Sequence, residues 1–141
     1  LLDSEVFVAA TFTHGRPGAT LAHGQASVAP GCYVLETPTD HWTEVVTGLG
    51  AAGVEIILAH VGEHPMQGHP LVPLLQASAA ADVRAHYGDD LDLALSGSVD
   101  GWAGELLDLL AATASRRYRP LTVAQDNTDF QFTRGLLGVS M

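Results

Sequence analysis

The sequence contains no lysine, only one cysteine and no long apolar run. Among its 141 residues, 16 are acidic and six are arginines, and the formal net charge is −10 at pH 7. This balance argues against a nucleic-acid partner, because a phosphate backbone requires a basic face. The lone Cys32 excludes an internal disulfide and a cysteine-rich zinc site. The longest apolar run, residues 54–61, falls short of the roughly 18 residues needed to span a membrane, so we expect no membrane partner.

The length of the chain predicts a single domain over residues 1–141, since domains most often run about 100–150 residues. The apolar fraction of 47% is typical of a folded globular protein. The first residues lack an initiating Met and a basic segment of the kind that begins a signal peptide. We therefore expect a cytoplasmic protein, and we expect the chain to be a fragment or a domain of a longer one.

The hydrophobic pattern alternates between strands and helices. A continuous β-branched run at 54–60 is typical of a strand covered on both faces. Pro73 within 71–78 predicts an edge or irregular strand. The alternation predicts an α/β fold, specifically a layered α/β/α Rossmann-like domain with a mostly parallel sheet. The expected helices are 5–14, 41–53, 80–87 and 98–117, and the expected strands are 19–24, 32–37, 54–60, 71–78, 91–96 and 129–134.

A histidine-rich loop, "HVGEHPMQGHP" at residues 60–70, is the first candidate site. It holds His60, His64 and His69 together with Glu63, while its glycines and prolines make a helix improbable. Three such side chains can bind zinc with one coordination position left open. Direct contact with a small molecule and a purely structural role are the other two interpretations. The loop follows an expected strand, at the end where parallel α/β folds bind ligands.

Acidic residues in "YGDDLDLALSG" are the second candidate. Asp89, Asp90 and Asp92 lie at the start of an expected strand, and their oxygens suit a hard cation. The alternative, which we favour, is that the first two form a turn and Asp92 caps a backbone group. Residues 125–129, "QDNTD", are expected to form a polar turn. The sequence contains no nucleophile elbow, P-loop or dinucleotide-binding fingerprint.

Four segments, taken in order, resemble the C-terminal part of the altronate/galactarate dehydratase family, which also includes sulfolactate sulfo-lyase. "PGCYVLETP" is similar to the family's P-G-x-Y-x-x-D-T-P, and "TGLGAAG" to its T-G-x-x-A-A-G. "GEHPMQGHPLVP" resembles its G-R-G-T-P-x-G-x-P-x-x-P, and "DLDLALSG" its N-x-D-x-N-A-G. The last helix and the tail "RGLLGVSM" resemble the family's C-terminal end. The resemblance extends over nearly the whole chain.

The resemblance implies a sugar-acid dehydratase or related hydroxy-acid lyase. In such an enzyme a base removes the proton α to a carboxylate, and a β-hydroxyl leaves as water. A divalent cation, Fe²⁺ or Mn²⁺, would stabilise the enediolate. The family's N-terminal region has no counterpart in these 141 residues, so a preceding segment or a companion subunit would complete the enzyme. The expected partner is a small hydroxy acid, and a homo-oligomer is compatible with this interpretation.

The resemblance also assigns residues. The expected catalytic residues are Glu63, as the base, and His64. No residue is assigned to the metal, and the substrate-binding candidates are Glu5, His60, His69 and Asp92. Two departures favour another interpretation. The lysine of the family's first motif is lost beside Glu5, and the arginine of T-G-R-G-T is replaced by Glu63, which would repel an anionic substrate. The alternative is a non-catalytic assembly or regulatory domain, and a third hypothesis is an independent metal-binding domain using the three histidines.

Overall fold

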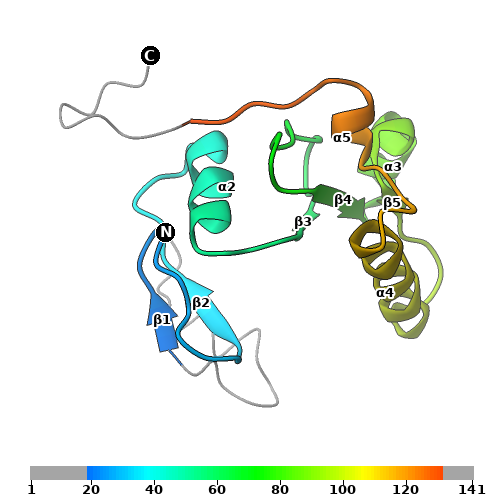
Figure 1. The fold of residues 1–141 in the computed structure, drawn as a ribbon. Helices are drawn as coiled ribbons and strands as arrows, with labels where there is room; N and C mark the ends of the chain where they lie inside the picture. The colour runs from blue at the N-terminus through cyan, green and yellow to red at the C-terminus, as the bar shows by residue number, and fades with distance from the viewer. Residues whose placement is uncertain (1–18, 132–141) are drawn as a thin grey trace. The chain divides into compact units, whose positions relative to one another are not determined.

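The computed structural model describes residues 19–131, which belong to two compact units (Figure 1). One unit extends to Val54 and resumes at Gln131, and the other comprises Glu55–Phe130. Both contain helices and short parallel strands, so the expected α/β class with parallel pairing is confirmed. The expected helix at 5–14 lies outside the described residues. The single domain over residues 1–141 stays a prediction.

The first unit contains β1 (Ala19–Leu21), β2 (Tyr33–Leu35) and α2 (Trp42–Ala51), each within the range that the sequence predicts. The two strands pair in parallel. After α2, Gly53 adopts a left-handed φ of +92°, and the Val54 N–H donates to the Leu49 carbonyl at 3.1 Å. Glycine takes this conformation without steric cost, and such a residue commonly ends a helix.

The second unit is built on a three-stranded sheet in the order β3-β4-β5. The strands are β3 (Ile57–His60), β4 (Leu74–Ser78) and β5 (Leu93–Ala94), and both pairings are parallel. The connection from β4 to β5 contains a helix, whereas the connection from β3 to β4 is the histidine-rich loop without helical structure.

Two strand predictions are wrong in detail. β3 was expected to be covered on both faces, but it is an edge strand and Leu58 is 42% exposed. The strand containing Pro73 was expected to be an edge or irregular strand, but β4 is central and every residue in it is buried. The reason is that Pro73 precedes the strand. The paired register begins at Leu74, opposite Ile57, so the missing N–H of Pro73 falls outside the ladder. The Pro73 carbonyl still accepts a hydrogen bond from the Ile57 N–H at 2.9 Å.

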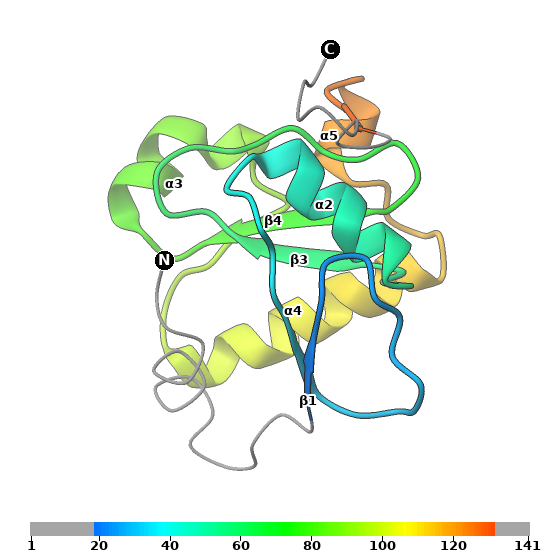
Figure 2. The ribbon, with the colours of Figure 1, turned by 90° about the vertical axis from the view of Figure 1, so that its left-hand side faces the viewer.

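The helices of this unit are α3 (Ala81–Tyr87), the 3₁₀ turn η1 (Gly88–Asp90), α4 (Val99–Ala114) and the short α5 (Leu121–Ala124). The first and third confirm the expected helices, whereas α5 was not predicted. Val83 of α3 packs with Val61 and Leu91 in a buried cluster. Figure 2 shows α4 running beneath β3 and β4 in that view. None of the helices within residues 19–131 is long and apolar enough to cross a bilayer.

The less exposed side of α4 comprises Trp102, Leu106, Leu109, Leu110 and Thr113. Leu107, on the other side of the helix, is 65% exposed. The strand expected at 129–134 is not formed over residues 129–131, and the rest of that range lies outside the described residues.

Gly68 joins the histidine-rich loop to the segment after α5. Its N–H donates to the Asn127 carbonyl at 2.9 Å, and its carbonyl accepts from the Asp129 N–H at 3.0 Å. A Cβ atom at this position would lie 2.7 Å from the Thr122 Cβ and would collide with its Oγ1. Thr122 is only 3% exposed and has little room to move. Only glycine therefore fits at position 68 without displacing Thr122.

We expect Gly68→Ala to lower the free energy of unfolding by about 1–3 kcal/mol, the usual cost of overpacking. Gly88→Ala is the matched control, because Gly88 has an ordinary helical φ of −54° and a Cβ there would meet no atom within 4 Å. Alanine at that position should be neutral or stabilising by up to about 1 kcal/mol. Urea denaturation of the two variants measures both values. Equal stability of the two variants would contradict the close approach at Gly68.

Candidate functional site

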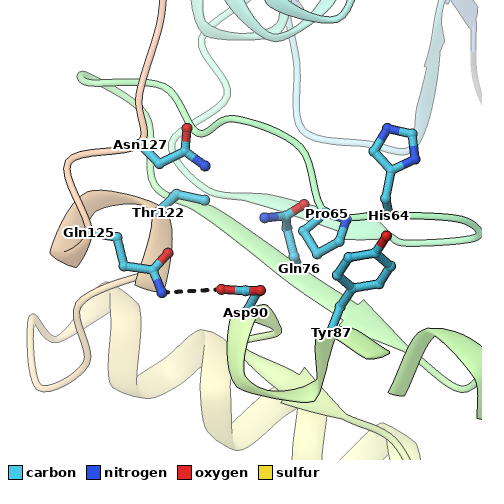
Figure 3. Close-up of a pocket in the computed structure, with 8 residues that line it drawn as sticks. All are labelled: His64, Pro65, Gln76, Tyr87, Asp90, Thr122, Gln125 and Asn127. Atoms are coloured by element: carbon cyan, nitrogen blue, oxygen red, sulfur yellow. Dashed lines mark hydrogen bonds between the residues drawn. The ribbon is translucent and has the colours of Figure 1, made fainter. Parts of the chain in front are cut away.

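A cavity of about 340 Å³ opens within Glu55–Phe130 (Figure 3). Its lining comes from the histidine-rich loop, from β4, from the end of α3 with η1, and from α5 with the following turn. Such a volume lies at the small end of the range for small-molecule pockets, about 300–1,000 Å³. The lining residues are His64, Pro65, Gln76, Tyr87, Asp90, Thr122, Gln125 and Asn127.

Gln76 connects the cavity to the centre of the sheet. It lies in β4 and is 1% exposed, and its amide forms two hydrogen bonds to one residue of the loop. Its Oε1 accepts from the Met66 N–H at 2.6 Å, and its Nε2 donates to the Met66 carbonyl at 3.0 Å. This pair of bonds fixes the loop over the strand. The sequence does carry a signal for this role, because a glutamine inside the apolar run "LVPLLQAS" must find partners when buried.

The other polar groups lie around the rim. Gln125 Nε2 donates to Asp90 Oδ1 at 3.4 Å, a long and exposed hydrogen bond. Figure 3 shows this pair on one side of the view and Tyr87 with His64 on the other, with Gln76 between them. The turn at 125–129 was expected to be only a polar connection, and the structure shows that it supplies two lining side chains.

The cavity only partly follows the general rule for parallel sheets. His64 and Pro65 belong to the loop that follows the carboxyl end of β3, as expected. Tyr87 and Asp90, however, precede β5, and Gln76 lies in the middle of β4. The cavity is therefore bounded on one side by residues before a strand.

The structure separates the sequence-assigned residues. His64 lines the cavity and is exposed. Glu63 and His60 are exposed and lie outside the lining, and Glu5 lies outside the described residues. The three histidines do not converge, and no three His, Cys, Asp or Glu side chains of residues 19–131 form a group that could hold a metal ion.

His69 is buried, at 4% exposure, and stabilises its own turn. Its Nδ1 accepts from the N–H groups of Leu71 and Val72, both at 3.2 Å, which places the ring proton on Nε2. That Nε2 is buried and has no hydrogen-bond partner in the described part of the chain. The ring lies edge-on to Phe130, with 6.2 Å between the ring centroids. Burial lowers the pKa of His69 from its usual 6.5, so the ring is neutral at pH 7. Its role in substrate binding stays a prediction.

Asp92 makes three hydrogen bonds within the unit. Its Oδ2 accepts from the Gln76 N–H at 2.7 Å, and its Oδ1 accepts from the Tyr118 hydroxyl at 2.8 Å and the Leu121 N–H at 2.9 Å. The expected bonding of Asp92 to backbone groups is confirmed. Burial, and then the hydrogen bond to Asp92 and its charge, raise the pKa of Tyr118. Asp92 thus joins β4 to α5, and both of these elements contribute residues to the lining of the cavity.

Comparison with known proteins does not name a family. No model of a known protein family matches the chain, and no curated protein sequence matches it either. The resemblance to sugar-acid dehydratases therefore depends on the ordered motifs alone. The cavity is an independent guide to function.

The pH dependence of stability tests the buried His69. Because the folded pKa is lowered, the unfolded chain takes up a proton at about pH 6.5 before the folded chain does. The free energy of unfolding should therefore fall as the pH drops below 6.5, by at most about 1.4 kcal/mol per pH unit. His69→Asn should reduce this dependence, since an amide oxygen can accept the same bonds without titrating. His64→Asn, at an exposed site, should not. Denaturation at pH 7.5 and at pH 5.5 measures the free energy of unfolding of each variant. If His69→Asn loses as much stability between these pH values as the parent does, buried His69 is not the cause of the pH dependence.

A double-mutant cycle tests the hydrogen bonds of Asp92. Asp92→Ala leaves two backbone N–H groups without their acceptor and should cost about 3 kcal/mol or more of unfolding free energy. Tyr118→Phe should cost about 1.5 kcal/mol. The double variant should lose less than the sum of the two, because both single changes remove the same bond. Asp89→Ala, at an exposed neighbour, should stay within about 0.5 kcal/mol of the parent. Additive losses would contradict the direct bond.

Proposed function

We propose that the chain is the C-terminal domain of a sugar-acid dehydratase of altronate/galactarate type or a related hydroxy-acid lyase, with the layered α/β/α Rossmann-like arrangement. The observation that carries the proposal is the position of His64. The loop that corresponds to the family's substrate loop supplies this residue to a cavity of small-molecule size. The parallel sheet and the helical connection from β4 to β5 support the layered arrangement. A cytoplasmic location is part of the same proposal.

His64 is the candidate for proton transfer. The imidazole of histidine is the side chain most often used as a general base. In this mechanism His64 takes the proton α to the carboxylate of the bound hydroxy acid. The carbon–oxygen bond to the β-hydroxyl then breaks, and the hydroxyl leaves as water with a returned proton. Glu63 is adjacent in sequence but outside the lining, so the proton transfer is assigned to His64 and not to Glu63.

The described residues do not fit the divalent cation that the resemblance implies. His64 and Asp90 are the only residues of metal-ligating type in the lining, and they are not part of a group of three. We assign no step on this chain to Fe²⁺ or Mn²⁺. In the proposed enzyme, ligands from the family's N-terminal region or a companion subunit would hold the cation.

The second candidate is a non-catalytic assembly or regulatory domain of the same fold. The lining contains neither lysine nor arginine, and the family's arginine position is occupied by Glu63. A carboxylate substrate is usually held by such a cation. Such a domain would keep the cavity for binding but would not catalyse a reaction.

The test is dehydration by the complete enzyme, with the N-terminal region or companion subunit present. Elimination of water from a 2,3-dihydroxy acid gives an enol that becomes a 2-oxo acid, which can be followed by its semicarbazone absorbance. We expect His64→Asn to lower kcat by about 10²-fold or more, with an unchanged melting temperature. His41→Asn, an exposed histidine outside the cavity, should leave kcat within about twofold of the parent. Unchanged turnover in His64→Asn contradicts the base, and no turnover of any sugar acid by the parent favours the non-catalytic domain.

A further inference from the structure

The cavity is lined mainly by uncharged hydrogen-bonding groups. Three side-chain amides, those of Gln76, Gln125 and Asn127, face it together with the Tyr87 hydroxyl. Each amide offers donors and an acceptor, and a phenol offers one donor and lone pairs. A ligand hydroxyl also donates and accepts. The lining is therefore complementary to a chain of hydroxyl groups.

These groups retain hydrogen-bonding capacity. After its two bonds to Met66, the Gln76 amide keeps one N–H and one lone pair. The side chains of Asn127 and Tyr87 make no hydrogen bond within residues 19–131. The buried Oγ1 of Thr122 lies against Gly68 and is not counted among these groups. The side chains of Tyr87 and Asn127 are exposed, so their free donors and acceptors bind water, which the hydroxyl groups of a ligand can replace.

The charges disfavour an anion inside the cavity. Asp90 contributes a carboxylate to the lining, which holds no lysine or arginine, and the net charge of the chain is −10. Two negative charges at about 4 Å repel by about 1 kcal/mol even in bulk water. A ligand carboxylate would therefore bind outside this lining.

We propose that the cavity binds the uncharged polyhydroxylated carbon chain of its ligand and does not hold a carboxylate. This inference rests on the proposed function, because it names the part of a hydroxy acid that the domain recognises. The volume of 340 Å³ corresponds to roughly eleven water molecules at about 30 Å³ each. A six-carbon polyol, with its dozen non-hydrogen atoms, is of comparable size.

The experiment compares three probes that share their internal hydroxyl groups and differ in charge: galactitol, galactonate and galactarate. Each is titrated into the 141-residue chain at pH 7 and constant ionic strength, followed by amide NMR shifts. Galactitol should bind most tightly and galactarate most weakly. The Kd for galactarate should be about fivefold higher than that for galactitol, the factor equivalent to repulsion of about 1 kcal/mol between one carboxylate and Asp90. The opposite order, with galactarate tightest, overturns the proposal. So does the absence of any shift with galactitol.

Variants locate the site. Asn127→Ala should weaken galactitol binding at least fivefold without lowering the melting temperature, because Asn127 is exposed. Asp90→Asn should reduce the penalty for galactarate, while Asp89→Asn, a neighbour outside the lining, should leave all three Kd values within about twofold. Unchanged galactitol binding in Asn127→Ala overturns the proposal, as does an unchanged charge penalty in Asp90→Asn.

The outcome is separable from that of the proposed function. If the complete enzyme dehydrates a sugar acid and galactitol fails to compete, the polyol site is wrong and the dehydratase stands. If galactitol binds through Asn127 and no sugar acid is turned over, the polyol site stands and the dehydratase is wrong.

Discussion

The carboxylate of Asp92 is the constraint on which the candidate site depends. It accepts hydrogen bonds from the backbone of Gln76 in β4, from the Tyr118 hydroxyl, and from the Leu121 N–H at the start of α5. β5 contains only two residues, so its own ladder contributes little to fixing this region. One ionised side chain therefore sets the distance between the strand that forms the floor of the cavity and the short helix that forms one wall. Hydrogen bonds to a charged acceptor are the stronger kind, which suits this role.

Gln76 links the part of the structure held by Asp92 to the histidine-rich loop. Its backbone N–H is bound to Asp92, and its side chain binds both backbone groups of Met66. Gly68 fixes the same loop a second time, through a parallel bridge to Thr128. The wall that carries His64 is thus connected to β4 and to the segment after α5 without a helix of its own. A loop held in this way can present side chains from a defined backbone, which is what a binding site requires.

Sequence reasoning succeeded where a local pattern determines the outcome. The alternating hydrophobic pattern was sufficient to place α2 and α4, and the β-branched residues were sufficient to place β3. Sequence reasoning failed where the outcome depends on distant neighbours. Pro73 was interpreted as a sign of an edge or irregular strand, although β4 begins one residue later and lies in the centre of the sheet. For the site, the loop indicated His64. Tyr87, Gln125 and Asn127 carry no motif, and only the tertiary structure brings them to the cavity. His69 has the sequence context of a ligand, but burial and its bonds to the following turn explain its position.

The anchoring of the histidine-rich loop is uneven. Hydrogen bonds hold the loop at Val61, Met66, Gly68 and His69. Gly62, Glu63 and His64, in contrast, are exposed, and the side chains of the last two make no hydrogen bond in the described part of the chain. Substitutions within these three positions should therefore have little effect on folding, since surface changes away from such contacts usually alter stability by less than about 0.5 kcal/mol. They would nevertheless change the charge and the shape beside the cavity. New ligand preferences could thus arise at this edge in single evolutionary steps, with the framework unaffected.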